Sequence, residues 1–191
     1  SNFPINTINW LYSQFNIDGG EIENVVFYDN PKLKIARITH STKRGPSSEK
    51  DNRLEIIKRN KQKFILLEQQ IYDATNPYVN IEFGNHHLSH AAYSYYTSPF
   101  EKASILSIDG VGEWETTSMY YGEGNKLFHL QSIDYPHSLG MLYSAFTAFL
   151  GFKPNEGEYK VMGLAPYGNP NTYSKQFQKL YKTTRDGGFE L

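Results

Sequence analysis

The sequence predicts an α/β fold in which helices flank a mixed sheet. Two observations lead to this prediction. Apolar residues recur at helical spacing in several segments, and short runs rich in β-branched and aromatic residues lie between them. The chain has 191 residues, of which 39% are hydrophobic. A chain of this size and composition can bury a hydrophobic core of its own.

Composition and charge exclude several classes of protein. Cysteine is absent, so disulfides and thiolate metal sites are excluded, and any metal must be held by histidines and carboxylates. This composition suits a reducing compartment, and we expect a cytoplasmic protein. The 19 basic and 20 acidic residues nearly balance, which argues against nucleic acid or an anionic membrane as a partner. No segment approaches the ~20 apolar residues of a transmembrane helix.

The first half of the chain predicts two helices and one strand. Apolar spacing after Pro4 indicates an amphipathic helix over about 4–16, and the run at 24–28 indicates a buried strand. Residues 39–52 contain no apolar side chain apart from one proline, so we expect a mobile loop there. Apolar residues at helical spacing then predict a longer helix over 54–73.

The second half predicts a strand and a helix, then three strands and a final helix. The expected elements cover residues 78–83, 86–97, 103–109, 116–122, 126–134 and 139–150. The three consecutive strands are typical of an antiparallel meander. Ser138 is the expected N-cap of the last helix, and Gly151 is expected to end it.

Three histidines lie within five residues, in the segment HHLSH. On a helix, His86 and His90 would lie one turn apart on the same face, which is a geometry that can chelate a metal. The strand that ends near Asp109 would supply a carboxylate to complete a site of two histidines and one carboxylate. Iron, zinc and manganese all suit such a set. The alternative is that these histidines are capping or surface residues.

The segment DGVGE, from Asp109 to Glu113, follows a predicted buried strand. Its glycines would let backbone N–H groups approach a phosphate while Asp109 faces a cation. The alternative is an ordinary hairpin turn. An Asp-Gly turn that joins the first two strands of a meander, with a helix after it, is the arrangement of actin-like and sugar-kinase-like ATPases.

Four ordered motifs extend this argument. They are HHLSHAA at 86–92, SPFEKASILSIDGVGEWETTS at 98–118, PHSLGMLYSAFTAFLGF at 136–152 and EYKVMGLAPYG at 158–168. Together they make the chain resemble the O-carbamoyltransferase family, which includes nodulation-factor and antibiotic-tailoring carbamoyltransferases. The resemblance extends over about 78–170.

The resemblance implies a partial actin-like (ASKHA, RNase H-like) domain, followed in the family by a second domain of the threonylcarbamoyl-adenylate synthase type. That second domain makes a carbamoyl adenylate from ATP and carbamoyl phosphate, and the actin-like domain transfers the carbamoyl group to an acceptor hydroxyl. The metal ligands would be His86, His90 and Asp109, with iron as the metal that the family implies. The adenylate would be held near the glycines of two motifs, Gly110, Gly112 and Gly140. No residue is assigned as catalytic.

The sequence also departs from the family pattern. The opening strand with its His-Asp-Ser motif has no counterpart before Ser1, and a later metal-binding aspartate would follow Leu191. We therefore expect residues 1–191 to be part of one actin-like domain that is truncated at both ends. We expect this part to be inactive by itself. Its expected partners are the missing segments, the second domain or a second copy in a homodimer. The competing functions are an actin-like or sugar-kinase-like ATPase and a noncatalytic metal-binding scaffold.

Overall fold

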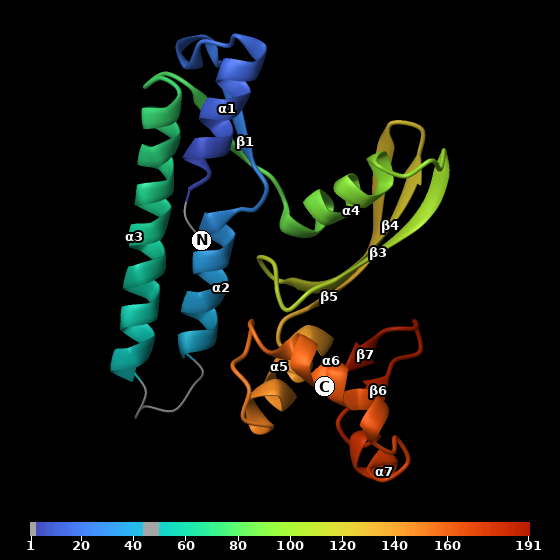
Figure 1. Cartoon of the computed structure of the whole chain (residues 1–191). Helices are drawn as coiled ribbons and strands as arrows, with labels where there is room; N and C mark the ends of the chain where they lie inside the picture. The colour runs from blue at the N-terminus through green and yellow to red at the C-terminus, as the bar shows by residue number, and fades with distance from the viewer. Residues whose placement is uncertain (1–2, 44–49) are drawn as a thin grey trace. The chain divides into compact units, whose positions relative to one another are not determined.

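The computed structural model describes residues 3–43 and 50–191 (Figure 1). It has mixed α/β structure and divides into two compact units, residues 1–86 and 87–191. Within the described residues, no helix combines the length and the apolar character that a membrane crossing requires. The expectation of one actin-like domain stays a prediction.

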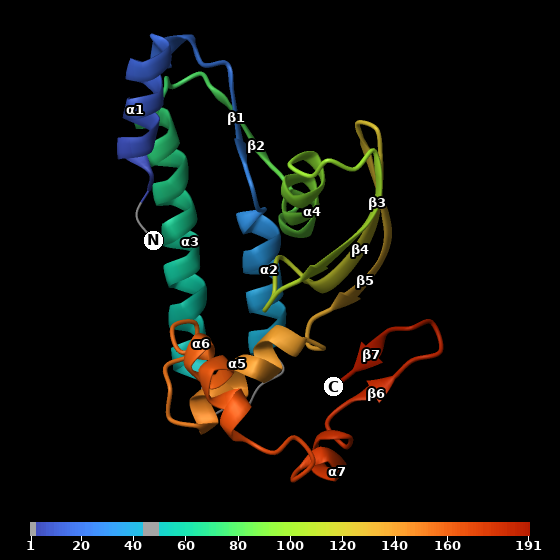
Figure 2. The same cartoon turned by 45° about the vertical axis from the view of Figure 1, so that its right-hand side comes forward.

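The first unit combines helices with one pair of strands. Its elements are α1 (Ile5–Phe15), the 3₁₀ turn η1 (Gly19–Glu21), β1 (Asn24–Phe27), α2 (Pro31–Lys43), α3 (Lys50–Ala74) and β2 (Asn80–Phe83). The two strands run parallel and side by side (Figure 2), and in their register Phe27 lies opposite Phe83. The Phe64 ring of α3 packs against the Phe83 ring at 5.6 Å between centroids, and the Tyr12 hydroxyl of α1 donates to the Ala74 carbonyl. Helix α3 therefore joins the strand pair to α1.

The prediction of a mobile loop over 39–52 is wrong for the residues that the structure describes. Residues 39–43 belong to α2 and residues 50–52 to α3, while 44–49 lie outside the described residues. The hydroxyls of Thr39 and Ser41 donate to carbonyls three or four residues earlier in α2. Polar side chains that would favour a loop are thus satisfied inside the helix.

The second unit contains most of α4, whose first residue is the last of the first unit. Its elements are α4 (His86–Tyr96), β3 (Lys102–Ile108), β4 (Glu115–Glu123), β5 (Lys126–Asp134), α5 (Leu139–Phe149), α6 (Glu158–Leu164), the 3₁₀ turn η3 (Ala165–Tyr167), α7 (Ser174–Phe177), β6 (Lys182–Thr183) and β7 (Phe189–Glu190). Strands β3, β4 and β5 form the expected antiparallel meander, in which β4 is central.

The core of the second unit lies between α4 and one face of the meander. It consists of Ala91 and Tyr95 from the helix and Ile105 and Tyr120 from the strands. The Tyr95 hydroxyl donates toward the carbonyls of Glu101 and Gly124 at the sheet end. Burial raises the pKa of Tyr120 to about 12, with Glu115 adding to the increase. This packing fixes α4 against β3 and β4.

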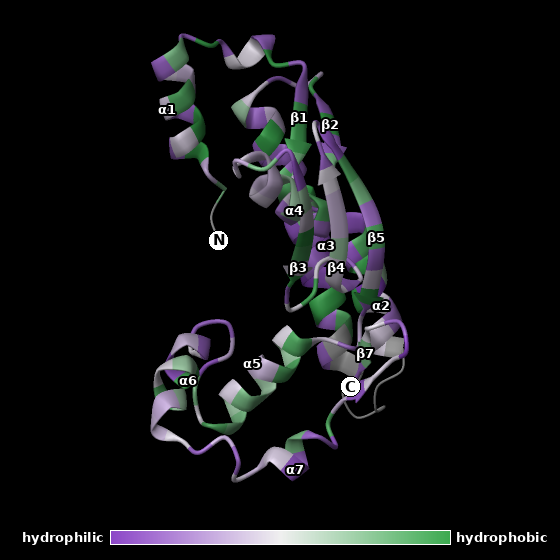
Figure 3. Cartoon of the chain, turned by 90° about the vertical axis from the view of Figure 1, so that its right-hand side faces the viewer, coloured by the Kyte–Doolittle hydropathy of each residue, from purple (hydrophilic) through white to green (hydrophobic). Residues whose placement is uncertain are grey.

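Helix α5 begins as the sequence predicts. The Ser138 hydroxyl accepts a hydrogen bond from the Met141 N–H at 3.0 Å, so Ser138 is the N-cap. Gly151, just beyond the end of the helix, has a φ of +84°, which glycine adopts readily. Figure 3 colours α5 mainly in green and pale tones, as its apolar sequence requires.

One expectation about the strands is not met. We expected a mixed sheet, but the strands form a parallel pair, the antiparallel meander and the small antiparallel pair β6–β7 as separate sheets. The parallel pair and the meander belong to different compact units, so within the described residues no sheet combines both strand directions. The actin-like arrangement remains a proposal.

Candidate metal centre

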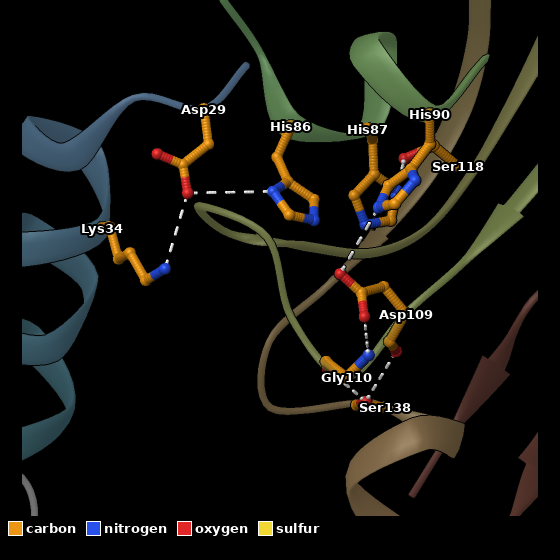
Figure 4. Close-up of polar contacts among 9 residues, drawn as sticks. All are labelled: Asp29, Lys34, His86, His87, His90, Asp109, Gly110, Ser118 and Ser138. Atoms are coloured by element: carbon orange, nitrogen blue, oxygen red, sulfur yellow. Dashed lines mark hydrogen bonds and ion pairs between the residues drawn. The ribbon is translucent and has the colours of Figure 1, made fainter. Parts of the chain in front are cut away.

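The two predicted histidine ligands lie one turn apart at the start of α4. Helix formation at His86 places His90 four residues later on the same face. Together with Asp109, each offers a ligand atom, and these three atoms lie within 4.8 Å of one another. Figure 4 shows the side chains of His86, His90 and Asp109 in this region. The structure thus brings the predicted ligand set together.

Asp109 is the first residue after β3 and is held by the turn that follows. Its N–H donates to the Thr116 carbonyl at 2.9 Å, and its Oδ1 accepts the Gly110 N–H at 2.6 Å. Its Oδ2 lies 3.9 Å from the Nε2 of His90. The carboxylate is therefore oriented by its own backbone turn, with one oxygen directed toward a histidine.

The donor set fits a divalent transition metal. Two imidazoles and one carboxylate suit iron, zinc or manganese. Ligand atoms bound at about 2.0–2.2 Å lie no more than about 4.4 Å apart, and His90 and Asp109 already satisfy that limit. The His86 side chain is 16% exposed and that of His90 is 57% exposed, so the cluster is open to solvent on one side.

His87, the middle histidine of the cluster, has a different environment. It is fully buried, and its Nδ1 lies 2.8 Å from the Ser118 hydroxyl on β4. The helix turns this side chain toward the meander, away from the face shared by its two neighbours. His87 is therefore a core residue that fixes α4 on the sheet.

Asp29 is a further acidic residue near the cluster. It lies just after β1 and is 6% exposed. Its Oδ2 lies 3.5 Å from the Lys34 Nζ and 3.8 Å from the Nδ1 of His86. Burial raises the pKa of Asp29, but the nearby His86 and Lys34 outweigh this effect and hold the pKa below its usual value. The side chain is thus a buried, ionised carboxylate beside a candidate ligand.

The glycine turn next to Asp109 packs closely on α5. A Cβ added at Gly140 would lie 2.6 Å from the Asp109 carbonyl oxygen, so glycine is required for this approach. The Ser138 hydroxyl donates to the Gly110 carbonyl. The N–H of Gly112 donates to the Glu115 carbonyl, and that of Gly110 to Asp109, so both have acceptors within the turn.

A cavity of about 360 Å³ opens beside this turn. Its lining includes Asp109, Gly110 and Val111 from the turn, with Met141 and Ser144 from α5 and Asn155 from the loop before α6. Three glycines were predicted to hold a nucleotide. Gly110 lines the cavity, and Gly140 packs against the backbone of the turn at Asp109 and Gly110. Gly112 contributes a hydrogen bond within the turn.

Sequence reasoning missed Asp29 and the cavity residues Ser144 and Asn155. Asp29 belongs to the sequence Asp-Asn-Pro, which is an ordinary turn signal and does not point to a site. Its burial depends on the folded first unit and has no local sequence signal. Ser144 and Asn155 are brought to the cavity by the path of the chain through α5, which spacing alone does not show.

Comparison with known proteins adds evidence on the family. The model of the carbamoyltransferase N-terminus family matches residues 3–191. The uncharacterized protein sll1178 of Synechocystis is 37% identical over the whole of this chain and 32% of its own length. Nodulation protein NolNO of Sinorhizobium fredii is 37% identical over 66% of this chain and 18% of its own length.

Nodulation protein NolO of Bradyrhizobium diazoefficiens is also 37% identical, over 56% of this chain and 19% of its own length. The chain therefore spans at most about a third of the length of these curated relatives. The family match extends beyond the motifs that carry the candidate metal ligands and takes in nearly every residue. The chain belongs to the family defined by the carbamoyltransferase N-terminus.

Proposed function

We propose that the full-length protein is an ATP-dependent O-carbamoyltransferase and that this chain supplies part of an actin-like domain with its metal centre. The observation that carries the proposal is the convergence of His86, His90 and Asp109 beside a cavity, within a chain that matches the carbamoyltransferase N-terminus family. The meander followed by α5 supports the actin-like assignment, because an Asp-Gly turn joins β3 to β4 as in that arrangement.

The proposed reaction transfers a carbamoyl group from carbamoyl adenylate to an acceptor hydroxyl. The carbamoyl adenylate derives from ATP and carbamoyl phosphate. A bond forms between the acceptor oxygen and the carbamoyl carbon, the bond from that carbon to the AMP phosphate oxygen breaks, AMP leaves, and the proton of the acceptor hydroxyl is released to solvent. A bound divalent metal would supply electrostatic stabilisation of phosphate charge.

The residues of the chain would hold and orient the reactants. His86, His90 and Asp109 would bind the metal, and the cavity beside the turn at Asp109 would take part of the adenylate. Gly140 contributes by allowing α5 to approach the Asp109 carbonyl. The preorganised turn would keep the carboxylate in place, which lowers the cost of forming the site when the metal binds.

A metal and activity assay on the full-length protein tests this function. The wild-type protein is purified with its metal, and His90→Ala is compared with His40→Ala, which replaces an exposed histidine of α2 that is not in the ligand cluster. Metal content is measured by elemental analysis, and products from carbamoyl phosphate, ATP and candidate hydroxyl acceptors are measured by mass spectrometry. We expect only His90→Ala to lose metal and transfer.

Each alternative predicts a different result. Unchanged metal content in His90→Ala would overturn the assignment of the ligands. ATP hydrolysis without any carbamoylated product would favour an actin-like or sugar-kinase-like ATPase. Metal retention with no affinity for ATP would favour a noncatalytic metal-binding scaffold.

A further inference from the structure

Asp29 has an environment that its role as a turn residue does not explain. Carboxylates are rarely buried unless a cation or hydrogen-bond donor compensates the loss of water. Asp29 is 6% exposed and lies between the end of β1 and the start of α2. The side chain faces two basic groups of the same compact unit, Lys34 of α2 and His86 at its last position.

Helix capping does not account for the position of this carboxylate. The Oδ1 of Asn30 accepts the N–H groups of Lys32 and Leu33, so Asn30 provides the side-chain cap of α2. Asp29 therefore has its side chain available for the contacts it makes with Lys34 and His86. Burial of a carboxylate that neither caps a helix nor contacts a cation would only cost free energy.

The contact with His86 involves a particular ring nitrogen. Asp29 Oδ2 lies 3.8 Å from Nδ1, and Figure 4 shows the other ring nitrogen of His86 on the opposite edge of the imidazole. A neutral imidazole that carries its proton on Nδ1 presents the lone pair of Nε2 to a metal. Metal-bound histidines usually donate their second N–H to a carboxylate or carbonyl, which fixes the ring and raises its basicity.

The geometry is close to that arrangement. The 3.8 Å separation exceeds a hydrogen bond by less than about 1 Å, so the proposed hydrogen bond requires the two side chains to move slightly closer together. The Tyr28 ring packs against the His86 ring with centroids 5.8 Å apart, which limits the positions that the imidazole can take. The Lys34 Nζ lies 3.5 Å from the same carboxylate oxygen.

We propose that Asp29 is a positioning residue for the metal centre: its carboxylate accepts a hydrogen bond from the Nδ1–H of His86 and thereby directs Nε2 toward the metal. This inference rests on the proposed function, because it requires His86 to be a ligand. Asp29 does not touch the metal. Its effect is on affinity, through the orientation and basicity of one ligand.

A cobalt titration of the full-length protein, stripped of metal, tests the proposal. Co²⁺ affinity is measured by competition with a chelator, and the absorption bands of bound Co²⁺ report the ligand geometry. The test variant is Asp29→Asn, which keeps the size of the side chain and removes its charge. We expect affinity to fall by about 10–100-fold, the usual effect of losing such a partner, with altered Co²⁺ bands.

Two control variants separate positioning from general disruption. Lys34→Met removes the other contact of the same carboxylate but leaves the carboxylate itself in place, so we expect a clearly smaller loss of Co²⁺ affinity than in Asp29→Asn. Asp73→Asn makes the same chemical change at an exposed position of α3. Thermal melts of the metal-free proteins show whether Asp29→Asn is folded. If it is not, Asp29→Glu, which keeps the charge on a longer side chain, is expected to recover much of the affinity.

The outcomes distinguish failure of this inference from failure of the proposed metal site. If His90→Ala loses Co²⁺ but folded Asp29→Asn binds it with wild-type affinity and bands, the site stands and Asp29 is not a positioning residue. If His90→Ala binds Co²⁺ as well as wild type, the metal site itself is wrong. An equal loss of affinity in Asp29→Asn and Lys34→Met would assign the effect to disturbance of α2 and would overturn the inference.

Discussion

Gly140 allows α5 to pack closely against the backbone turn that positions Asp109. It lies in the first turn of α5, where an added Cβ would come within 2.6 Å of the Asp109 carbonyl oxygen and 2.8 Å of the Gly110 nitrogen. Both neighbours are backbone atoms, so they cannot move aside without moving the Asp109 turn. The position of a candidate metal ligand thus depends on a glycine thirty-one residues further along the chain.

We predict that Gly140→Ala lowers the free energy of unfolding by about 1–3 kcal/mol, the usual cost of overpacking. Gly163 in α6 is the matched control, because an added Cβ there has open space around it. Gly163→Ala should stabilise by roughly 0.5–1 kcal/mol through lower backbone entropy of the unfolded chain. Denaturant unfolding of the two full-length variants measures both effects. Equal stability of Gly140→Ala and wild type would contradict the close approach.

The sequence predicted much of the candidate site at the level of single residues, but not all of it. The spacing of His86 and His90 is sufficient to place them on one helical face, and the strand before Asp109 places a carboxylate at its end. His87 shares the same local pattern, yet the structure buries it against Ser118. Its role depends on packing between α4 and the meander, which no spacing encodes.

At the scale of elements, local sequence signals explain which helices and strands were predicted correctly and why α2 was not. The meander and α5 follow from alternation, turns and the Ser138 cap, and all are present. Helix α2 was missed because its second half is rich in Thr and Ser, which have low helix propensity. Asn30 followed by Pro31 is a start signal that could have found it, since the Asn side chain caps and Pro suits the first turn.

The stability of helix α6 should depend on pH, because its first residue is a titratable glutamate. Glu158 accepts hydrogen bonds from the backbone of Asn155 and the side chain of Ser144, with further backbone donors, and these lower its pKa. A carboxyl whose folded pKa is lowered contributes stability above its unfolded pKa of about 4.3 and loses that contribution as pH falls through the folded pKa. Acid should therefore loosen the connection between α5 and α6.

We predict that Glu158→Gln lowers the melting temperature at pH 7 and that the difference from wild type narrows below about pH 4. Glu156→Gln is the control in the loop just before α6, because the Glu156 carboxylate forms an exposed ion pair with Lys153. That variant should melt close to wild type at both pH values. Thermal melts of the full-length proteins at pH 7 and pH 3 check this. A gap for Glu158→Gln that stays constant with pH would show that ionisation of Glu158 is not involved.

At the scale of the whole molecule, the meander has one face covered and one face exposed. Helix α4 packs on the face that carries Ile105 and Tyr120. The alternate positions on the other face expose Leu106, which is 58% accessible, and Met119 opposite it on β4, which is 43% accessible. Exposed apolar residues that lie together on a sheet face favour association with another chain.

The 191-residue chain should therefore associate with itself through this face. Burial of this face removes apolar area from water, worth about 25 cal/mol per Å². The double variant Leu106→Ser with Met119→Ser should reduce association, whereas Tyr78→Ser, which replaces a single aromatic that is 92% exposed, should not. Light scattering over a concentration series measures association. A monomer that stays stable across the whole series would show that the exposed face needs no partner.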